Sequence, residues 1–320
     1  MLDVYITVDT EIWCDGWDSL DEKFSDSFQR YIYGKTPKGD YALPMTLEIL
    51  RDNGLKGVFF VEPLFSTRFG RSALEEMVGL IKEQKQEIQL HIHTEWLDEA
   101  TCPIFPEIKE KKQFLYQFDE HEQTTIIKHG LDLLREVGVP NITAFRAGSY
   151  AANADTLKAL KAVGVSVDTS YNPAANHLEQ SIFPNRGVHQ REVLNETCVY
   201  PVGVIDDGRG QRHLQVTACS LAEFKYALDT AEKNGWDSLV IVTHNFELMN
   251  QAKNGVDIIV CKRFQKLCEY LNKNTDRFRT RWFNGAPTDS FIGAVEPLKS
   301  KRLLTGLRYV EQGLRRVLVR

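Results

Sequence analysis

Apolar residues along this chain fall into short runs that alternate with longer amphipathic stretches. The short runs, rich in β-branched and aromatic residues, predict strands over residues 4–8, 57–61, 87–91, 142–146, 165–168, 199–204, 239–244 and 279–283. The longer stretches repeat apolar residues every three or four positions and predict helices over residues 45–52, 73–84, 120–136, 154–162, 221–234 and 256–271. This alternation predicts an α/β fold built on a mainly parallel sheet.

Polar side chains cluster at the predicted carboxyl ends of different strands. They are Asp9, Glu11, His91, His93, Arg146, Asp168 and His244. A (β/α) barrel builds its site at these strand ends, and no glycine-rich phosphate loop follows the first strand to suggest an open nucleotide-binding sheet. We therefore predict a distorted (β/α) barrel of about seven parallel strands with helices outside, spanning residues 1–290. The poorly periodic stretches 13–41 and 171–195 predict loops that shape substrate access.

Two short strings contain a candidate metal centre. Asp9 and Glu11 stand two residues apart in an extended run, as do His91 and His93, so each pair faces one side of its strand. Two imidazoles and a carboxylate are typical ligands of zinc in hydrolases or iron(II) in oxygenases. A second carboxylate beside such a site can accept a proton from water. Either pair taken alone fits a structural role equally well.

Composition narrows the class of protein. Hydrophobic residues make up 42% and charged residues 26% of the chain, as in soluble globular proteins. A net charge of −5 argues against nucleic acid as the main partner. The six cysteines are dispersed and include no CxxC pair, which favours reduced thiols. The first predicted strand starts too early for a secretory leader, so we expect a cytoplasmic protein.

Residues 291–320 predict a basic helical tail. Seven Lys or Arg and one Glu give residues 298–320 a charge of +6, so the remaining residues carry −11. Its apolar residues, Leu303, Leu307, Val310, Leu314 and Val317, share one face of the helix. The more ordinary interpretation is a helix packed on the barrel or on a neighbouring subunit. The alternative is peripheral contact with an anionic membrane at the inner face.

Five strings occur in an order that resembles a known family. They are TVDTE at 7–11, EIQLHIHTEW at 87–96, FRAGSY at 145–150, VDTSY at 167–171 and IVTHNFEL at 241–248. Together they resemble the motifs of the polysaccharide deacetylase family, also called the NodB-homology family or carbohydrate esterase family four. The resemblance covers roughly residues 2–248. It implies a metal-dependent de-N-acetylase on a distorted (β/α) barrel.

The resemblance also implies catalytic roles. Asp9 stands at the position of the base, and Arg146 at that of the arginine that holds the base carboxylate. His244 would be the general acid, and Asp168 would supply the carboxylate that raises its pKa.

The implied metal ligands are Glu11, His91 and His93, with zinc the preferred ion. Family members usually carry their two histidine ligands four residues apart, but here Glu95 stands four residues after His91. Either His93 or Glu95 is therefore the third ligand, and we favour His93. Which of Asp9 and Glu11 is base and which is ligand also stays open. The aromatic residues Trp13, Trp96 and Tyr150 are candidates for substrate binding.

We therefore predict a metal-dependent hydrolase that removes the acetyl group from an N-acetylated sugar, releasing acetate and a free amine. The expected substrate is a nucleotide-linked or lipid-linked precursor, or an envelope polysaccharide. Three alternatives stay open: a non-sugar amidohydrolase on the same barrel, a catalytically silent glycan-binding protein, and an iron oxygenase. The sequence does not indicate an oligomeric state.

Overall fold

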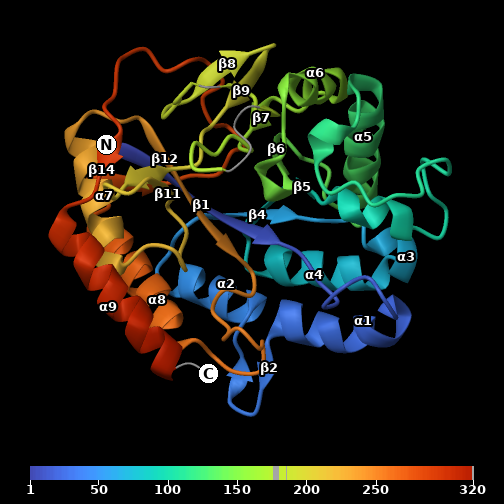
Figure 1. The fold of residues 1–320 in the computed structure, drawn as a ribbon, viewed down its shortest axis with the longest axis horizontal. Helices are drawn as coiled ribbons and strands as arrows, with labels where there is room; N and C mark the ends of the chain where they lie inside the picture. Colours follow the sequence, from blue (N-terminus) through green and yellow to red (C-terminus); the bar gives the residue numbers. More distant parts are fainter. Residues whose placement is uncertain (176–179, 185, 319–320) are drawn as a thin grey trace. The chain divides into compact units, whose positions relative to one another are not determined.

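The structure is a computed structural model that describes residues 1–175, 180–184 and 186–318. The chain forms two compact units (Figure 1). The first comprises Met1–Gly57, Val202–Arg281 and Gly293–Arg320, and the second comprises Val58–Pro201 and Trp282–Ile292. Both units contain parallel strands and helices, so the predicted α/β class is confirmed.

The first unit is built on a long buried strand, β1 (Leu2–Thr10), all nine residues of which are buried. It pairs in parallel with β12 (Ser238–His244) and with β13 (Phe278–Thr280). Strands buried on both faces are mostly apolar, which is why β1 and β12 lack the alternation of a half-exposed strand.

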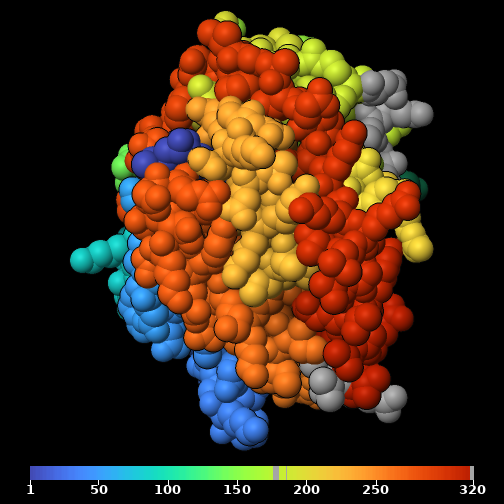
Figure 2. Space-filling model, turned by 90° about the vertical axis from the view of Figure 1, so that its left-hand side faces the viewer, coloured from blue at the N-terminus to red at the C-terminus, as the bar shows by residue number. Residues whose placement is uncertain are grey.

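Helices α2 (Leu43–Asp52), α7 (Leu221–Lys233), α8 (Ile258–Lys273) and α9 (Arg302–Leu318) complete the first unit. Helix α8 contacts α2 and α7, and α7 contacts α9. Figure 2 shows α9, in red, on the surface beside α7, in amber. A small sheet of β10 (Val204–Asp206), β11 (Gln211–His213) and β14 (Leu298–Lys299) leads into α9.

Two sequence predictions in the first unit need correction. The stretch 13–41, predicted as a loop, contains α1 (Leu20–Phe28), a π-helix (Gln29–Tyr33) and the short strands β2 (Lys35–Thr36) and β3 (Gly39–Asp40). Only Leu20, Ser27 and Phe28 of α1 are buried, which leaves too few apolar positions for the helical period to show. The predicted strand 199–204 is divided around Pro201 into β9 (Thr197–Val199), which belongs to the second unit, and β10, because proline has no N–H to donate to a strand ladder.

The second unit is a parallel array with one antiparallel edge. Its strands follow the order β4 (Gly57–Val61), β5 (Glu87–Ile92), β6 (Ala144–Ala147), β7 (Val167–Asp168) and β9 (Thr197–Val199), with antiparallel β8 (Glu192–Leu194) at the edge. Its α-helices are α3 (Ser66–Phe69), α4 (Ser72–Glu83), α5 (Glu120–Glu136) and α6 (Ala154–Val163). Helices α5 and α6 pack side by side (Figure 1).

Short 3-10 turns and helix caps complete the second unit. The turns are η2 (Thr94–Glu99), η3 (Leu115–Gln117) and η4 (Gly148–Tyr150). Asp119 caps α5 and Asn153 caps α6, each with its side chain accepting from a backbone N–H of the first turn. Among the residues that the structure describes, none of the helices combines the length and apolar character needed to cross a bilayer.

A buried ion-pair cluster fastens α9 to the first unit. Arg308 is only 1% exposed, and its guanidinium lies 2.7 Å from a carboxylate oxygen of Asp207 and 3.1 Å from one of Glu223. Glu223 also belongs to the capping box at the start of α7, where it accepts from the backbone N–H of Ser220 at 2.9 Å. The same carboxylate therefore stabilises the start of α7 and holds α9.

We expect Arg308→Met to lower the free energy of unfolding by about 3 kcal/mol at neutral pH, because two buried carboxylates would lose their shared cation. Urea denaturation measures this change. The matched control Arg302→Met, on the exposed side of the same helix, should change stability by less than about 0.5 kcal/mol. Equal effects of the two substitutions would contradict the assignment of Arg308 as the cation of this cluster.

Candidate active site

The first unit brings Asp9 and His244 together at the carboxyl ends of two strands. Parallel pairing of β1 with β12 places these two residues directly opposite each other. Their side chains approach to 4.0 Å between His244 Nε2 and Asp9 Oδ2. Asp9 is 3% exposed, whereas the His244 side chain is 24% exposed. A nearly buried carboxylate therefore lies beside an imidazole that solvent or a substrate can reach.

Glu247, which the sequence analysis did not select, is the carboxylate that holds His244. Its Oε1 accepts from His244 Nδ1 at 2.8 Å, and its Oε2 accepts from the Thr243 hydroxyl at 3.0 Å. Gln215 donates to the same carboxylate. Because Nδ1 is engaged by Glu247, Nε2 is the ring nitrogen that faces Asp9.

The protonation of His244 follows from these neighbours. Burial alone lowers the pKa of His244, but the hydrogen bond and the charge of Glu247 raise it, and so do the charges of Glu11 and Asp9. The result is a pKa raised to about 9. His244 is therefore cationic at neutral pH, as a general acid must be.

Asp168, expected to act on His244, has Ser170 as its hydrogen-bond partner, whereas Glu247 contacts His244. The carboxylate of Asp168 accepts from the backbone N–H of Ser170 at 2.8 Å and from its hydroxyl at 2.6 Å. Burial raises the pKa of Asp168 to about 6, although the Ser170 hydrogen bonds and the charge of Arg146 lower it. Glu247 follows His244 by three residues, a spacing that the sequence analysis passed over.

Glu11 is held by its backbone and by its side chain. Its N–H donates to Asn245 Oδ1 at 3.0 Å, and its Oε1 accepts from the indole N–H of Trp13 at 2.9 Å. The N–H of Asn245 also donates to the carbonyl of Asp9 at 3.1 Å. Asn245, the residue after β12, is therefore hydrogen-bonded to the end of β1 and to the residue that follows it. Trp13, expected to bind substrate, here orients the Glu11 carboxylate.

In the second unit, His91 and His93 each have one ring nitrogen engaged. His91 Nδ1 lies 2.8 Å from the backbone carbonyl of Arg146, which can only accept, so Nδ1 carries the proton. His93 Nδ1 lies 3.2 Å from a carboxylate oxygen of Glu95. In both rings Nδ1 contacts an oxygen acceptor and fixes the ring orientation, as is typical of metal-binding histidines. Glu95 therefore orients His93.

The turn after β6 fits closely against His93. A Cβ added to Gly148 would lie 2.6 Å from His93 Nδ1, so only glycine leaves room for the ring there. The next two residues, Ser149 and Tyr150, both adopt left-handed backbone conformations, with φ of 54° and 57°. Consecutive left-handed residues other than glycine are strained, and such strain is often found at functional sites. Tyr150 is half-buried in this turn.

Arg146 is fully buried next to the same turn. Its Nε donates to the carbonyl of Thr169 at 3.1 Å, and its guanidinium lies 4.5 Å from the ring centroid of Phe60. Register between the strands places Arg146 opposite His91. A guanidinium held by backbone and aromatic contacts keeps its charge in a fixed position.

Trp96 also needs a correction. It is 1% exposed and packs edge-on against Phe65 and Phe69, with ring centroids 6.4 Å and 6.0 Å away. A ring enclosed in this way has no face for a sugar, so Trp96 is a core residue.

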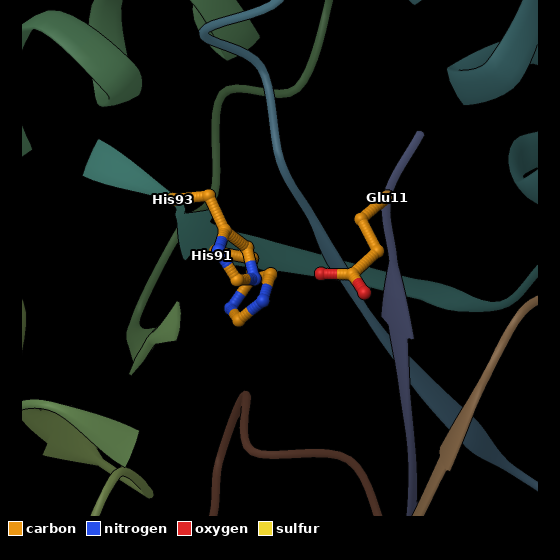
Figure 3. Close-up of side chains that lie close together, drawn as sticks. All are labelled: Glu11, His91 and His93. Atoms are coloured by element: carbon orange, nitrogen blue, oxygen red, sulfur yellow. The ribbon is translucent and has the colours of Figure 1, made fainter. Parts of the chain in front are cut away.

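Glu11, His91 and His93 form a group that could hold a metal ion. One ligand atom from each lies within 4.8 Å of the others, and all three residues are buried (Figure 3). The group contains His93 and Glu11, and does not contain Glu95 or Asp9. Two imidazole nitrogens and a carboxylate oxygen are the donor set of catalytic zinc sites, which keep further positions open for water and substrate. The residues therefore fit a zinc ion.

A cavity of about 900 Å³ lies beside Glu247 in the first unit. Its lining includes Phe246, Lys253 and Arg316. Neither Lys253 nor Arg316 forms an ion pair within the described part of the chain. Burial lowers the pKa of Lys253, whose Nζ lies 4.8 Å from the ring centroid of Phe246. Glu247, Asp257 and Arg315 also line the cavity, so its three cations exceed its two carboxylates and it can accept an anion.

No protein-family model and no curated protein sequence matches the chain. Among solved structures, a 4-alpha-glucanotransferase from Thermococcus litoralis has a TM-score of 0.54 and 10% identity, with 89% of this chain and 40% of that chain covered. This likeness is one of fold.

Two further similar structures are of a polysaccharide deacetylase and a carbohydrate esterase. A provisionally assigned polysaccharide deacetylase from Mycobacterium smegmatis is 18% identical, with 86% of each chain covered and a TM-score of 0.48. A family 4 carbohydrate esterase from Streptomyces lividans, in complex with acetate, is 10% identical, with 88% of this chain and 92% of that chain covered and a TM-score of 0.42.

Proposed function

We propose that this protein is a metal-dependent de-N-acetylase, which hydrolyses the acetamido group of an N-acetylated sugar to a free amine and acetate. The observation that carries the proposal is the donor group of Glu11, His91 and His93, with both imidazoles oriented through Nδ1. A cationic His244 beside Asp9 supplies the acid and the base that amide hydrolysis needs.

In this mechanism Glu11, His91 and His93 hold a divalent metal ion, which supplies Lewis acidity at the acetyl carbonyl and lowers the pKa of a water. Asp9 accepts the proton of the attacking water. His244 then delivers its Nε2 proton to the departing nitrogen, which would otherwise leave as an unstable amide anion. Glu247 holds His244 in the cationic form until that step.

Arg146 and Asp168 are assigned positioning roles. We propose that Arg146, whose guanidinium is buried, is the arginine that positions the base carboxylate, as the sequence resemblance implies. Asp168, locked by Ser170, interacts with the charge of Arg146 and so helps to hold it. Tyr150, in its left-handed turn, is proposed to contact the substrate.

We further propose that the sugar is attached to a phosphate-bearing carrier, as in a nucleotide-linked or lipid-linked precursor made in the cytoplasm. The cavity beside Glu247 supports this proposal, because its lining has more cations than carboxylates and neither Lys253 nor Arg316 forms an ion pair among the described residues. A neutral polysaccharide would leave these two charges unmatched.

We expect the purified protein to bind one equivalent of zinc and to release acetate, and His91→Ala to lose both properties. Asp9→Asn should keep the metal and lower kcat by about 10²- to 10⁴-fold, because only the proton acceptor is removed. Metal analysis and acetate release measure the two effects. The matched control His121→Ala, at an exposed histidine, should change neither.

Other outcomes of the same experiment identify the alternatives. Loss of metal in Asp9→Asn with retention in Glu11→Gln would exchange the roles of these two residues. Full activity after chelation would indicate a metal-free amidohydrolase, and absence of acetate at any metal loading would indicate a silent glycan-binding protein. Loss of activity under anaerobic conditions would indicate an oxygenase.

Glu247→Gln should move the alkaline limb of the pH–activity profile to lower pH. Removing the Glu247 charge lowers the pKa of His244 from about 9, so the acid is deprotonated earlier as pH rises. Measuring kcat as a function of pH detects the shift. Glu107→Gln, which changes an exposed carboxylate, is the control. An unchanged alkaline limb would rule out His244 as the acid held by Glu247.

Lys253→Ala should raise KM about tenfold for a nucleotide-linked N-acetyl sugar and leave KM for the corresponding free sugar unchanged. UDP-N-acetylglucosamine and N-acetylglucosamine are suitable probes for steady-state assays. Lys38→Ala, which removes an exposed lysine elsewhere in the first unit, should affect neither substrate. Equal effects of Lys253→Ala on both probes would contradict a phosphate-binding cavity.

A further inference from the structure

Helix α9 turns its charged side toward the protein and its apolar side outward. Thr305 and Arg308 are 7% and 1% exposed. The outward side chains form a stripe of five residues: Leu303 (73% exposed), Leu307 (51%), Val310 (62%), Leu314 (52%) and Val317 (71%). Surface helices normally bury their apolar face, and a contiguous exposed apolar stripe marks an interaction surface. We call this set of five residues the apolar stripe.

Three sets of ion pairs fix the orientation of the helix. Besides the buried Arg308 cluster, Glu311 pairs with Arg263 on α8, and Arg315 pairs with Asp257 at the start of α8. Asp257 is 1% exposed and also caps α8 through the N–H groups of Ile259 and Val260. Rotating α9 to bury the apolar stripe would break all of these pairs and leave buried charges unmatched. The stripe therefore stays outward.

Exposed cations flank the apolar stripe at both ends. Lys299, Lys301 and Arg302 lie at the start of α9, and Arg316 lies near its end. Glu311 is the single acidic residue of the helix, and its charge is taken by Arg263. The outward side of α9 thus combines apolar and cationic groups, which is the chemistry that binds anionic lipid surfaces.

A hollow of about 510 Å³ at the start of α9 adds to this surface. Arg209, Lys299 and Arg302 line it together with Asp206 and Asp207. Asp207 is already paired with Arg212 and Arg308, so the cations outnumber the remaining acid. Such a hollow suits the phosphate of a lipid headgroup.

The spacing of the stripe, four and three residues in alternation, also matches the seam of a coiled coil. A second copy of the chain would, however, bring Arg302 and Arg316 of both helices together with no acidic residue to pair with them. The seam is also only about two heptads long, which is marginal for a coiled coil. Charge complementarity therefore favours an anionic surface over a second copy.

We propose that α9 docks this protein on an anionic phospholipid surface. The apolar stripe enters the boundary between headgroups and acyl chains, and the flanking cations contact lipid phosphates. Figure 2 shows the helix on the surface, where α7 lies against only one of its sides. Residues 1–297 carry a net charge of −11, so an anionic surface would repel them. Residues 298–320, which include α9, carry +6 and supply the attraction. This docking does not require the proposed deacetylase activity, although Arg316 also lines the cavity beside Glu247.

Vesicle flotation with the full-length protein tests the proposal. It should bind vesicles of phosphatidylcholine containing about one-third phosphatidylglycerol, and it should not bind pure phosphatidylcholine. Reversing two charges in Arg302→Glu/Arg316→Glu should weaken binding about 25-fold or more, since each basic residue near the surface contributes about fivefold. The matched control Lys38→Glu/Lys109→Glu reverses two exposed charges elsewhere and should weaken it much less.

The apolar part is tested by Leu307→Gln/Leu314→Gln, which should abolish binding, whereas Ile292→Gln, at a residue 94% exposed outside α9, should not. Thermal unfolding without lipid should be unchanged in both variants, because neither site is buried. Absence of binding to anionic vesicles, or binding that survives Leu307→Gln/Leu314→Gln, would overturn the proposal. A lipid-independent dimer that this double substitution dissolves, with no vesicle binding, would assign the stripe to a second copy instead.

Discussion

Parallel pairing of two strands, one buried throughout and the other up to its last residue, is the constraint on which the arrangement of Asp9 and His244 depends. The register of β1 against β12 sets Asp9 opposite His244, and no other feature is needed to make these two groups neighbours. The apolar residues of both strands hold that register, because a slip would move buried side chains out of place. Asp9 and His244 therefore lie at the carboxyl ends of their strands, beyond the apolar residues that hold the register.

Hydrogen bonds at one ring nitrogen decide what the other nitrogen can do. His91 Nδ1 contacts a backbone carbonyl and His93 Nδ1 contacts a carboxylate, which fixes the orientation of both rings. The contact of His244 with Glu247 instead favours the cation. The three histidines therefore differ in the partner of Nδ1. Gly148 contributes by leaving room for the His93 ring.

Helix α9 shows how charge can direct an apolar surface outward. Burying Arg308 between Asp207 and Glu223 is tolerable only because each charge has a partner at hydrogen-bond distance. This arrangement occupies the side of the helix that would ordinarily be apolar. The exposed stripe is the consequence, and it has no stabilising role unless something covers it.

The sequence by itself determined the elements and the chemistry at their ends. Long periodic segments such as α5 and buried runs such as β4 were predicted with the bounds that the structure has, because periodicity records burial directly. The residues at strand ends were likewise found from the alternation of side chains. Helix α1 was missed because most of its residues are polar or exposed. Only the tertiary structure decided which partner each group has. Glu247 contacts His244, and Ser170 contacts Asp168. Trp96 is enclosed in the core, and the apolar face of α9 is exposed to solvent. Those partners come from loops and from residues far apart in the chain, and local patterns carry no information about such contacts.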